Sequence, residues 1–151
     1  MQPNEIIKKH IAPCGLHCGG CFAFNGGKIQ KHSGELAKSL GNFDVYAQRF
    51  VTMLDEPVFE NYQAFKSMLH YFSETKCNGC REQQCALFKS CNVRDCFRQK
   101  GVDFCYQCDS FPCSQTGFDE HLYKRFISIN EKIREIGIEN YYDGIKDLPR
   151  Y

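Results

Sequence analysis

The chain has 151 residues, of which 42% are hydrophobic, and its formal net charge at neutral pH is +1. This length suits one domain with its own core, and the balanced charge gives no general attraction to nucleic acid or anionic membrane. No apolar run approaches the ~20 residues of a membrane span, and the start of the chain lacks the apolar stretch of an export signal. The composition therefore predicts a cytoplasmic protein without a membrane partner.

The first twelve residues are predicted to be a short approach segment, followed by the cysteine-bearing motif PCGLHCGGC. Glycines interrupt the next stretch, so residues 22–34 are predicted to form a loop. Ser33 is a suitable N-cap for a short helix over residues 35–40, and Gly41 would end that helix.

Two amphipathic helices are predicted next, over residues 43–54 and, with Pro57 in its first turn, over residues 57–72. Aromatic and aliphatic side chains recur along both at intervals of three and four residues. Such stripes are much more often core than ligand groove, so we interpret them as the buried faces of a small aromatic core.

The segment from Cys77 to Cys113 holds eight cysteines but little apolar periodicity, so it is predicted to be irregular apart from one helix. That helix runs over residues 92–100 and stops at Gly101. Ordering each irregular residue costs about 1–2 kcal/mol of backbone entropy. A structural zinc site contributes about 10–16 kcal/mol, so two sites could replace the missing apolar contacts.

Thr116, with Asp119 three residues later, resembles a capping box at the start of the best-defined helix. Apolar residues keep helical spacing from there to Gly137, and a further short helix is predicted over residues 138–148. The expected fold is mainly α, a single domain over residues 1–151. Four or five helices form its aromatic core, and the metal-stapled cysteine module of residues 77–113 packs against that core.

Eleven cysteines is an odd number, and in a reducing cytosol thiolate ligands are more plausible than disulfides. Three pairs have the C-x-x-C spacing that lets two sulfurs of one turn reach the same ion. We therefore assign all eleven as candidate metal ligands. They are Cys14, Cys18, Cys21, Cys77, Cys80, Cys85, Cys91, Cys96, Cys105, Cys108 and Cys113.

The eight downstream thiolates would fill two closed, tetrahedral four-cysteine zinc sites. Their grouping cannot be deduced from sequence. One arrangement puts Cys77 and Cys80 with Cys91 and Cys96, and leaves Cys85 with the last three. Two iron-sulfur clusters, each held by four cysteines, are the alternative. The spacing differs from the compact ferredoxin run, which favours zinc.

The upstream cysteines are more ambiguous. Their C-x3-C-x2-C spacing is that of radical S-adenosylmethionine enzymes, in which three cysteines hold a [4Fe-4S] cluster with one open position. Catalytic zinc is also held by three ligands. The chain lacks the length and the strand–helix alternation of the barrel those radical enzymes use. His17, inside the motif, is a candidate fourth ligand that would close the site, and His10 and His32 flank it.

The segments APCGLHCGGC, CNGCR and CNVRDCFRQKGVDFCYQCDSFPC, in this order and followed by a helix with IGIENY, resemble the prokaryotic cysteine-rich family called domain of unknown function 3795. The resemblance implies a small metal-binding bacterial or archaeal protein and carries over no catalytic residue.

The sequence therefore predicts a metal-binding protein with two or three Zn²⁺ ions that serves as a macromolecular interaction module. Its partner is expected to be a protein rather than nucleic acid, because the basic residues of the cysteine module are diluted by acidic ones. The alternative is an iron-sulfur protein in electron transfer or in redox or radical enzymology, with its open site at the upstream cysteines. No catalytic residue can be assigned, so the sequence leaves enzymatic activity open and favours a binding role.

Overall fold

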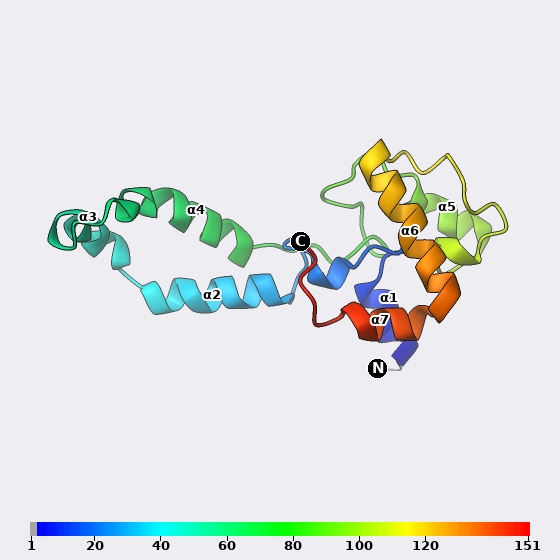
Figure 1. The fold of residues 1–151 in the computed structure, drawn as a ribbon, viewed down its shortest axis with the longest axis horizontal. Helices are drawn as coiled ribbons and strands as arrows, with labels where there is room; N and C mark the ends of the chain where they lie inside the picture. The colour runs from blue at the N-terminus through cyan, green and yellow to red at the C-terminus, as the bar shows by residue number, and fades with distance from the viewer. Residues whose placement is uncertain (1–2) are drawn as a thin grey trace.

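The computed structural model describes residues 3–151, and within this range the chain has seven α-helices, three short 3-10 helices and no strand. The mainly helical class predicted from sequence is confirmed. Figure 1 shows that α2, α3 and α4 extend to one side, away from the other helices and the cysteine-bearing loops. We call residues 28–73 the arm, and residues 3–27 and 74–151 the head.

The head contains four α-helices joined by irregular segments. They are α1 (Pro3–His10), α5 (Val93–Lys100), α6 (Glu120–Ile136) and α7 (Ile138–Ile145), with 3-10 turns η1 (Cys18–Gly20) and η3 (Cys105–Gln107). The predicted stops are confirmed. Gly101 after α5 and Gly137 after α6 have φ of 65° and 82°, a conformation that favours glycine.

The start of α6 lies later than predicted. Asp119 is the N-cap, and its Oδ1 accepts a hydrogen bond from the Leu122 amide (2.9 Å). Thr116 is instead buried in the preceding loop, where its carbonyl accepts the Asn92 amide (2.9 Å). Asp suits the N-cap because its carboxylate satisfies a free amide and favours the positive end of the helix dipole.

The main core lies where α6 meets the N-terminal motif and the cysteine module. Phe126 of α6 is fully buried there, and it packs with Leu16 of the motif and with Val93 and Phe111 of the module. Several cysteines pack against the same cluster. The cysteine module packs against α6 as predicted, and the cysteine-bearing segments also supply much of the apolar lining of this core.

A second cluster joins α1 to α7. Ile7, Ile11 and Phe104 are buried together, and side chains of α7 such as Tyr142 cover them. The segment predicted as an approach over residues 1–12 is therefore a packed helix from Pro3 to His10, and residues 1–2 of that prediction lie outside the described residues.

The arm runs out along α2 (Lys28–Leu40) and α3 (Phe43–Met53) and returns through η2 (Pro57–Asn61) and α4 (Tyr62–Ser73). The predicted loop over residues 22–34 was wrong beyond Gly27, which is the N-cap of α2. Ser33 is not a cap but a buried residue within the helix. The glycines suggested a loop, but a Cβ at Gly34 would meet nothing within 4 Å, and a glycine within a helix costs only about 0.5–1 kcal/mol relative to alanine.

The two helices predicted over residues 43–54 and 57–72 are confirmed as α3 and as η2 followed by α4. Phe43, Phe50, Phe59 and Tyr62 form an aromatic cluster near the tip, with ring centroids 5.0–5.9 Å apart. The stripes are nevertheless not the protein's core, because no further layer covers them. The arm leaves many large apolar side chains exposed: Leu36, Val45, Tyr46, Met53, Leu54, Val58, Phe65, Met68 and Tyr71.

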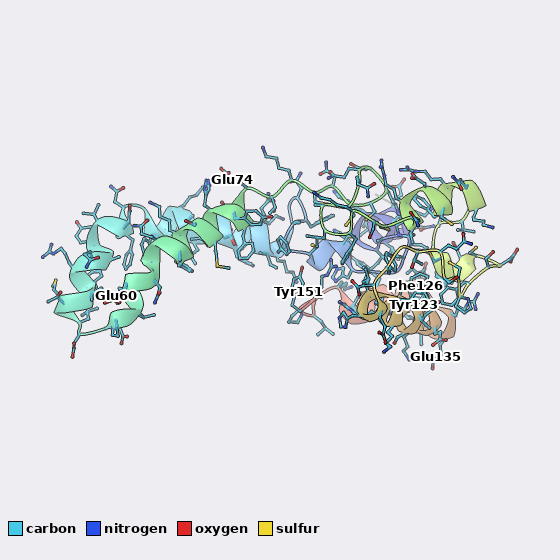
Figure 2. The ribbon with its side chains drawn as sticks, turned by 90° about the horizontal axis from the view of Figure 1, so that it is seen from above. Glu60, Glu74, Tyr123, Phe126, Glu135 and Tyr151 are labelled. Carbon is cyan, nitrogen blue, oxygen red and sulfur yellow. The ribbon has the colours of Figure 1, made fainter. Side chains whose placement is uncertain are left out.

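The base of the arm is tied to the head and to the C-terminal end of the chain. Figure 2 places Glu60 far out on the arm and Glu74 and Tyr151 near its base. The ring of Phe22 contacts those of Phe72 and Tyr151, with centroids 5.8 and 6.5 Å apart, and Lys28 Nζ pairs with Asp147 Oδ1 at 3.0 Å. None of the helices in residues 3–151 is long and apolar enough to cross a membrane.

Candidate metal centre

The N-terminal motif forms a tight turn fixed against α6. Gly15 has φ of 89°, and a Cβ there would lie 2.7 Å from Ile129 Cγ2, so only glycine fits. Asn130 of α6 is fully buried, and its Nδ2 donates to the Cys14 carbonyl (2.8 Å). The Cys21 amide then donates to the Cys18 carbonyl (2.9 Å), which closes the turn between those two cysteines.

A short backbone pairing brings a second C-x-x-C pair beside this turn. The Asn25 amide donates to the Cys77 carbonyl (2.9 Å), and the Cys77 amide donates to the Ala23 carbonyl (3.0 Å). The segment that follows Cys21 is thereby aligned with the one that begins at Cys77, although the whole arm separates them in sequence. The upstream motif is therefore not an isolated site, because it shares its surroundings with the cysteine module.

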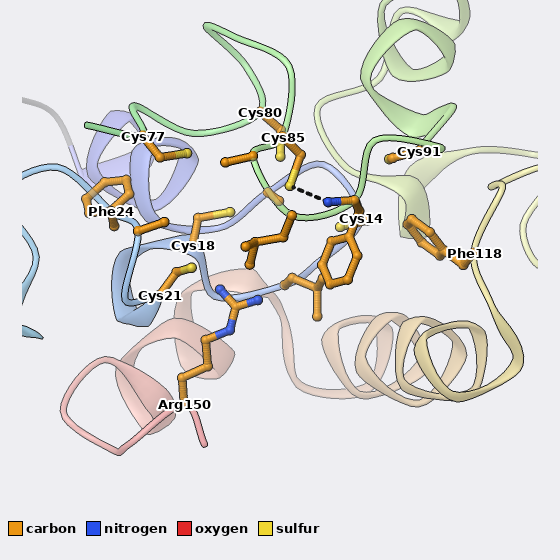
Figure 3. A pocket seen from close by; sticks show the side chains of 16 residues that line it. Cys14, Cys18, Cys21, Phe24, Cys77, Cys80, Cys85, Cys91, Phe118 and Arg150 are labelled. Carbon is orange, nitrogen blue, oxygen red and sulfur yellow. Dashed lines mark hydrogen bonds between the residues drawn. The ribbon is translucent and has the colours of Figure 1, made fainter. Parts of the chain in front are cut away.

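Seven cysteines line one small cavity in this region, the first thiol cavity (Figure 3). They are Cys14, Cys18, Cys21, Cys77, Cys80, Cys85 and Cys91. The cavity volume is about 30 Å³. Pockets for organic ligands typically measure about 300–1,000 Å³, so this one has room for ions but not for an organic cofactor.

Cys80 lies close to both Cys18 and Cys85, whose thiols have the largest influence on its pKa. The Phe88 amide donates to Cys85 Sγ at 3.4 Å, and the Tyr151 hydroxyl donates to Cys21 Sγ at 3.6 Å. Figure 3 shows Arg150 extending toward the thiols from the C-terminal segment. Within the described residues, its Nε is among the few buried polar side-chain atoms without a hydrogen-bond partner.

The other four cysteines line a second thiol cavity, also of about 30 Å³, between α5 and the loop before α6. They are Cys96, Cys105, Cys108 and Cys113. The Cys105 amide donates to the Pro13 carbonyl (2.8 Å), which ties this loop to the N-terminal motif. The fourth member is Cys96 on α5, whereas the grouping suggested from sequence places Cys85 there.

All eleven cysteines are free thiols, so none is paired in a disulfide. As the side chains stand, no three His, Cys, Asp or Glu residues among those described form a group that could hold a metal ion. Metal ligation by the cysteines therefore stays a prediction.

His17 lies away from both thiol cavities. It lines a separate surface hollow with α6 and α7, and its ring meets that of Tyr142 edge-on, with centroids 6.4 Å apart. Burial, as the larger cause, and the nearby Arg150 lower its pKa. His10 is engaged through Nδ1 with the Tyr142 hydroxyl (2.8 Å), and His32 is an exposed residue 3.5 Å from Glu35.

Five of the thiols have a raised pKa, which favours their protonated form: Cys14, Cys80, Cys85, Cys91 and Cys105. Burial, as the main cause, raises the pKa of Cys105 to about 12, with neighbouring thiols adding to it. The pKa of Cys80 is also raised to about 12, chiefly by its hydrogen bond to Cys18. A metal ion binding here would have to displace these protons.

Arg81 and Arg150 are the two residues near the first thiol cavity that sequence reasoning missed. Arg81 is half-buried, donates to the Lys8 and Asp103 carbonyls at 3.0 and 2.7 Å, and lies close enough to interact electrostatically with Cys14, Cys18 and Cys80. Arg81 directly follows Cys80, so its position in the sequence could have indicated that it lies near the thiols. Nothing in the sequence connects Arg150 with cysteines so far upstream.

A family model described as "Protein of unknown function (DUF3795)" matches residues 10–118. The match includes every cysteine of both thiol cavities and the whole arm. No curated protein and no solved structure matches the chain.

Proposed function

The chain belongs to the DUF3795 family of proteins of unknown function, and because that name carries no activity, we propose a function from its cysteines: it binds metal ions, zinc first, through thiolates. One observation carries this proposal. Eleven free thiols from segments far apart in the chain gather around two small cavities. Thiolates are preferred ligands of zinc and of iron-sulfur clusters.

The donor set fits zinc better than an iron-sulfur cluster. The second thiol cavity has four cysteines, the number that a closed tetrahedral zinc site needs. Each cavity is small, which suits bare metal ions rather than a bulky cluster with its own sulfides. The ions would connect loops that have few helices and no strands, and would so stabilise the head.

Elemental analysis of protein purified without oxygen tests this proposal. We expect a colourless protein with zinc bound and no iron. A brown solution that contains iron and absorbs broadly near 400 nm would instead establish the iron-sulfur alternative. Absence of both metals, with the thiols paired on titration, would overturn both.

Metal affinity is expected to fall steeply as the pH is lowered. An ordinary cysteine thiol has a pKa of about 8.5, and the pKa of Cys105 is raised to about 12, so metal binding at neutral pH must displace protons. Each ion in a closed site must therefore release up to about four protons, so the logarithm of its affinity should rise by up to about four per pH unit between pH 6 and 8. Competition with a coloured chelator measures this slope. A pH-independent affinity would contradict thiolate ligation.

We assign the arm to binding a helix of another protein. Phe65, Met68 and Tyr71 are exposed at three-residue spacing along α4, and Met68 is 60% exposed. An apolar stripe of this spacing matches the ridges of a second helix. Residues 28–73 carry five basic and five acidic residues, a balance that favours a protein over nucleic acid.

Photo-crosslinking in cells tests this assignment, with the reactive group at position 68 and a matched control at the exposed position 31 of α2. We expect one cellular protein to crosslink from position 68 only. Once purified, the crosslinked partner should bind the wild type and the Lys31→Ala variant equally. It should bind the Met68→Glu variant at least tenfold more weakly, a loss of about 1.4 kcal/mol in binding free energy. A crosslink to a second copy of this chain, or none, would contradict the assignment.

A further inference from the structure

The seven cysteines of the first thiol cavity form two groups on either side of Cys80. Cys18, Cys21 and Cys77 lie on one side, where they pack with Phe24 beside the Asn25–Cys77 backbone pairing. Cys14, Cys85 and Cys91 are the remaining three; Cys85 lies close to Cys91, and Cys91 packs, as Cys18 and Cys80 also do, against the buried cluster that contains Cys14. Figure 3 shows Cys80 between the two groups, and its thiol interacts with Cys18 of one group and Cys85 of the other.

Seven cysteines are too few for two separate tetrahedral sites, because two isolated ions need eight thiolates. A thiolate sulfur has more than one lone pair and can bind two ions at once. Two tetrahedral ions that share one thiolate take seven cysteines between them, which is the number around this cavity.

We propose that the first thiol cavity holds a pair of metal ions bridged by the Cys80 thiolate. One ion is completed by Cys18, Cys21 and Cys77, and the other by Cys14, Cys85 and Cys91. This inference rests on the proposed thiolate metal binding and deepens it. With one further ion in the second thiol cavity, the chain holds three ions and uses every cysteine.

The surrounding charges fit such a cluster. Seven thiolates outnumber the positive charges of two divalent ions, so the cluster is anionic and needs nearby cations. Arg81 interacts electrostatically with Cys80, Cys18 and Cys14. Arg150 lines the same cavity with its buried Nε free of a hydrogen-bond partner within the described residues. A guanidinium stays charged when buried, which suits it to this compensating position.

Cobalt substitution tests the bridge. The full chain is produced in cobalt-containing medium, purified without oxygen and examined by metal analysis and electron paramagnetic resonance. Two Co²⁺ ions that share a thiolate couple their spins antiparallel and lose their signal, whereas an isolated ion keeps it. We expect three ions per chain but only about one third of the signal of three isolated ions.

Two cysteine variants separate the sites. Cys108→Ser should empty the second thiol cavity and leave a coupled, nearly silent pair. Cys80→Ser should remove the bridge, so at least one ion is lost and the signal per bound cobalt rises about threefold. Lys31→Ala serves as the unaffected control, because Lys31 is exposed on α2 of the arm and lines neither thiol cavity.

Other outcomes are equally distinct. Three ions with full signal would overturn the bridge while leaving the proposed metal binding intact. Two ions, with three thiols that react readily in the native protein, would overturn it in favour of one closed site beside three free cysteines. A chain that binds no cobalt, zinc or iron would overturn the proposed function itself.

Discussion

Removing the proposed metal ions with a chelator is expected to unfold the head. The main core is built on the cysteine-bearing loops, since Cys14 belongs to the buried cluster and Cys80, Cys91, Cys105 and Cys108 pack against it. These loops contain few regular hydrogen bonds, and fixing each of their residues costs about 1–2 kcal/mol. Each structural zinc site offsets this by about 10–16 kcal/mol, which is comparable to the whole stability of a typical domain, about 5–15 kcal/mol.

Near-ultraviolet circular dichroism measures this effect, because Phe111, Phe118 and Tyr123 all lie in or against the main core. We expect that signal to disappear when metal analysis shows the ions gone, and to return when zinc is restored to the reduced protein. The control is His32→Ala, which removes an exposed arm histidine and should bind and lose metal as the wild type does. A metal-free protein with unchanged aromatic dichroism would refute a structural role for the ions.

Gly117→Ala is expected to destabilise the protein by about 3 kcal/mol or more, from an unfavourable backbone conformation and a steric clash. Gly117 has φ of 76°, and an added Cβ would lie 2.1 Å from the Ser90 carbonyl oxygen. Because that oxygen belongs to the backbone, no change of side-chain rotamer can relieve the clash. Ser90 and Asn92 are hydrogen-bonded to residues 115–117, so a shift here would displace the intervening Cys91.

The matched control is Gly144→Ala, in the last turn of α7. An added Cβ there meets nothing within 4 Å, and alanine in a helix is more stable than glycine by about 0.5–1 kcal/mol. Denaturant unfolding of the metal-loaded variants gives both values. If Gly117→Ala lowers the free energy of unfolding by less than about 1 kcal/mol, the backbone at Ser90 moves to accommodate the added Cβ, and the prediction is wrong.

Local signals predicted the helices well, and their ends less well. Gly101 and Gly137 stop α5 and α6 because a left-handed residue ends a helix without help from the rest of the fold. Thr116 and Ser33 were misread as caps because a hydroxyl residue can also be buried. Thr116 is held by Asn92, twenty-four positions earlier, and Ser33 faces the interior of the arm.

The grouping of the cysteines could not be predicted, because it depends on contacts between distant segments. The Asn25–Cys77 pairing places the upstream motif against Cys77 and Cys80, and α5 carries Cys96 toward Cys105. Neither contact leaves a trace in sequence spacing. Periodicity likewise identified the apolar faces of α3 and α4 but could not reveal that Tyr46 and Phe65 lack a covering layer.

The pairing of Asn25 with Cys77 also joins the two chain segments that lead into and out of the arm. The two ends of the arm come together beside this backbone pairing. The pairing can therefore position the thiols of the head whatever the length of the arm. Each doubling of the length of a flexible connection costs only about 0.6 kcal/mol. If the arm binds a partner as proposed, its length would set how far from the thiols that partner lies.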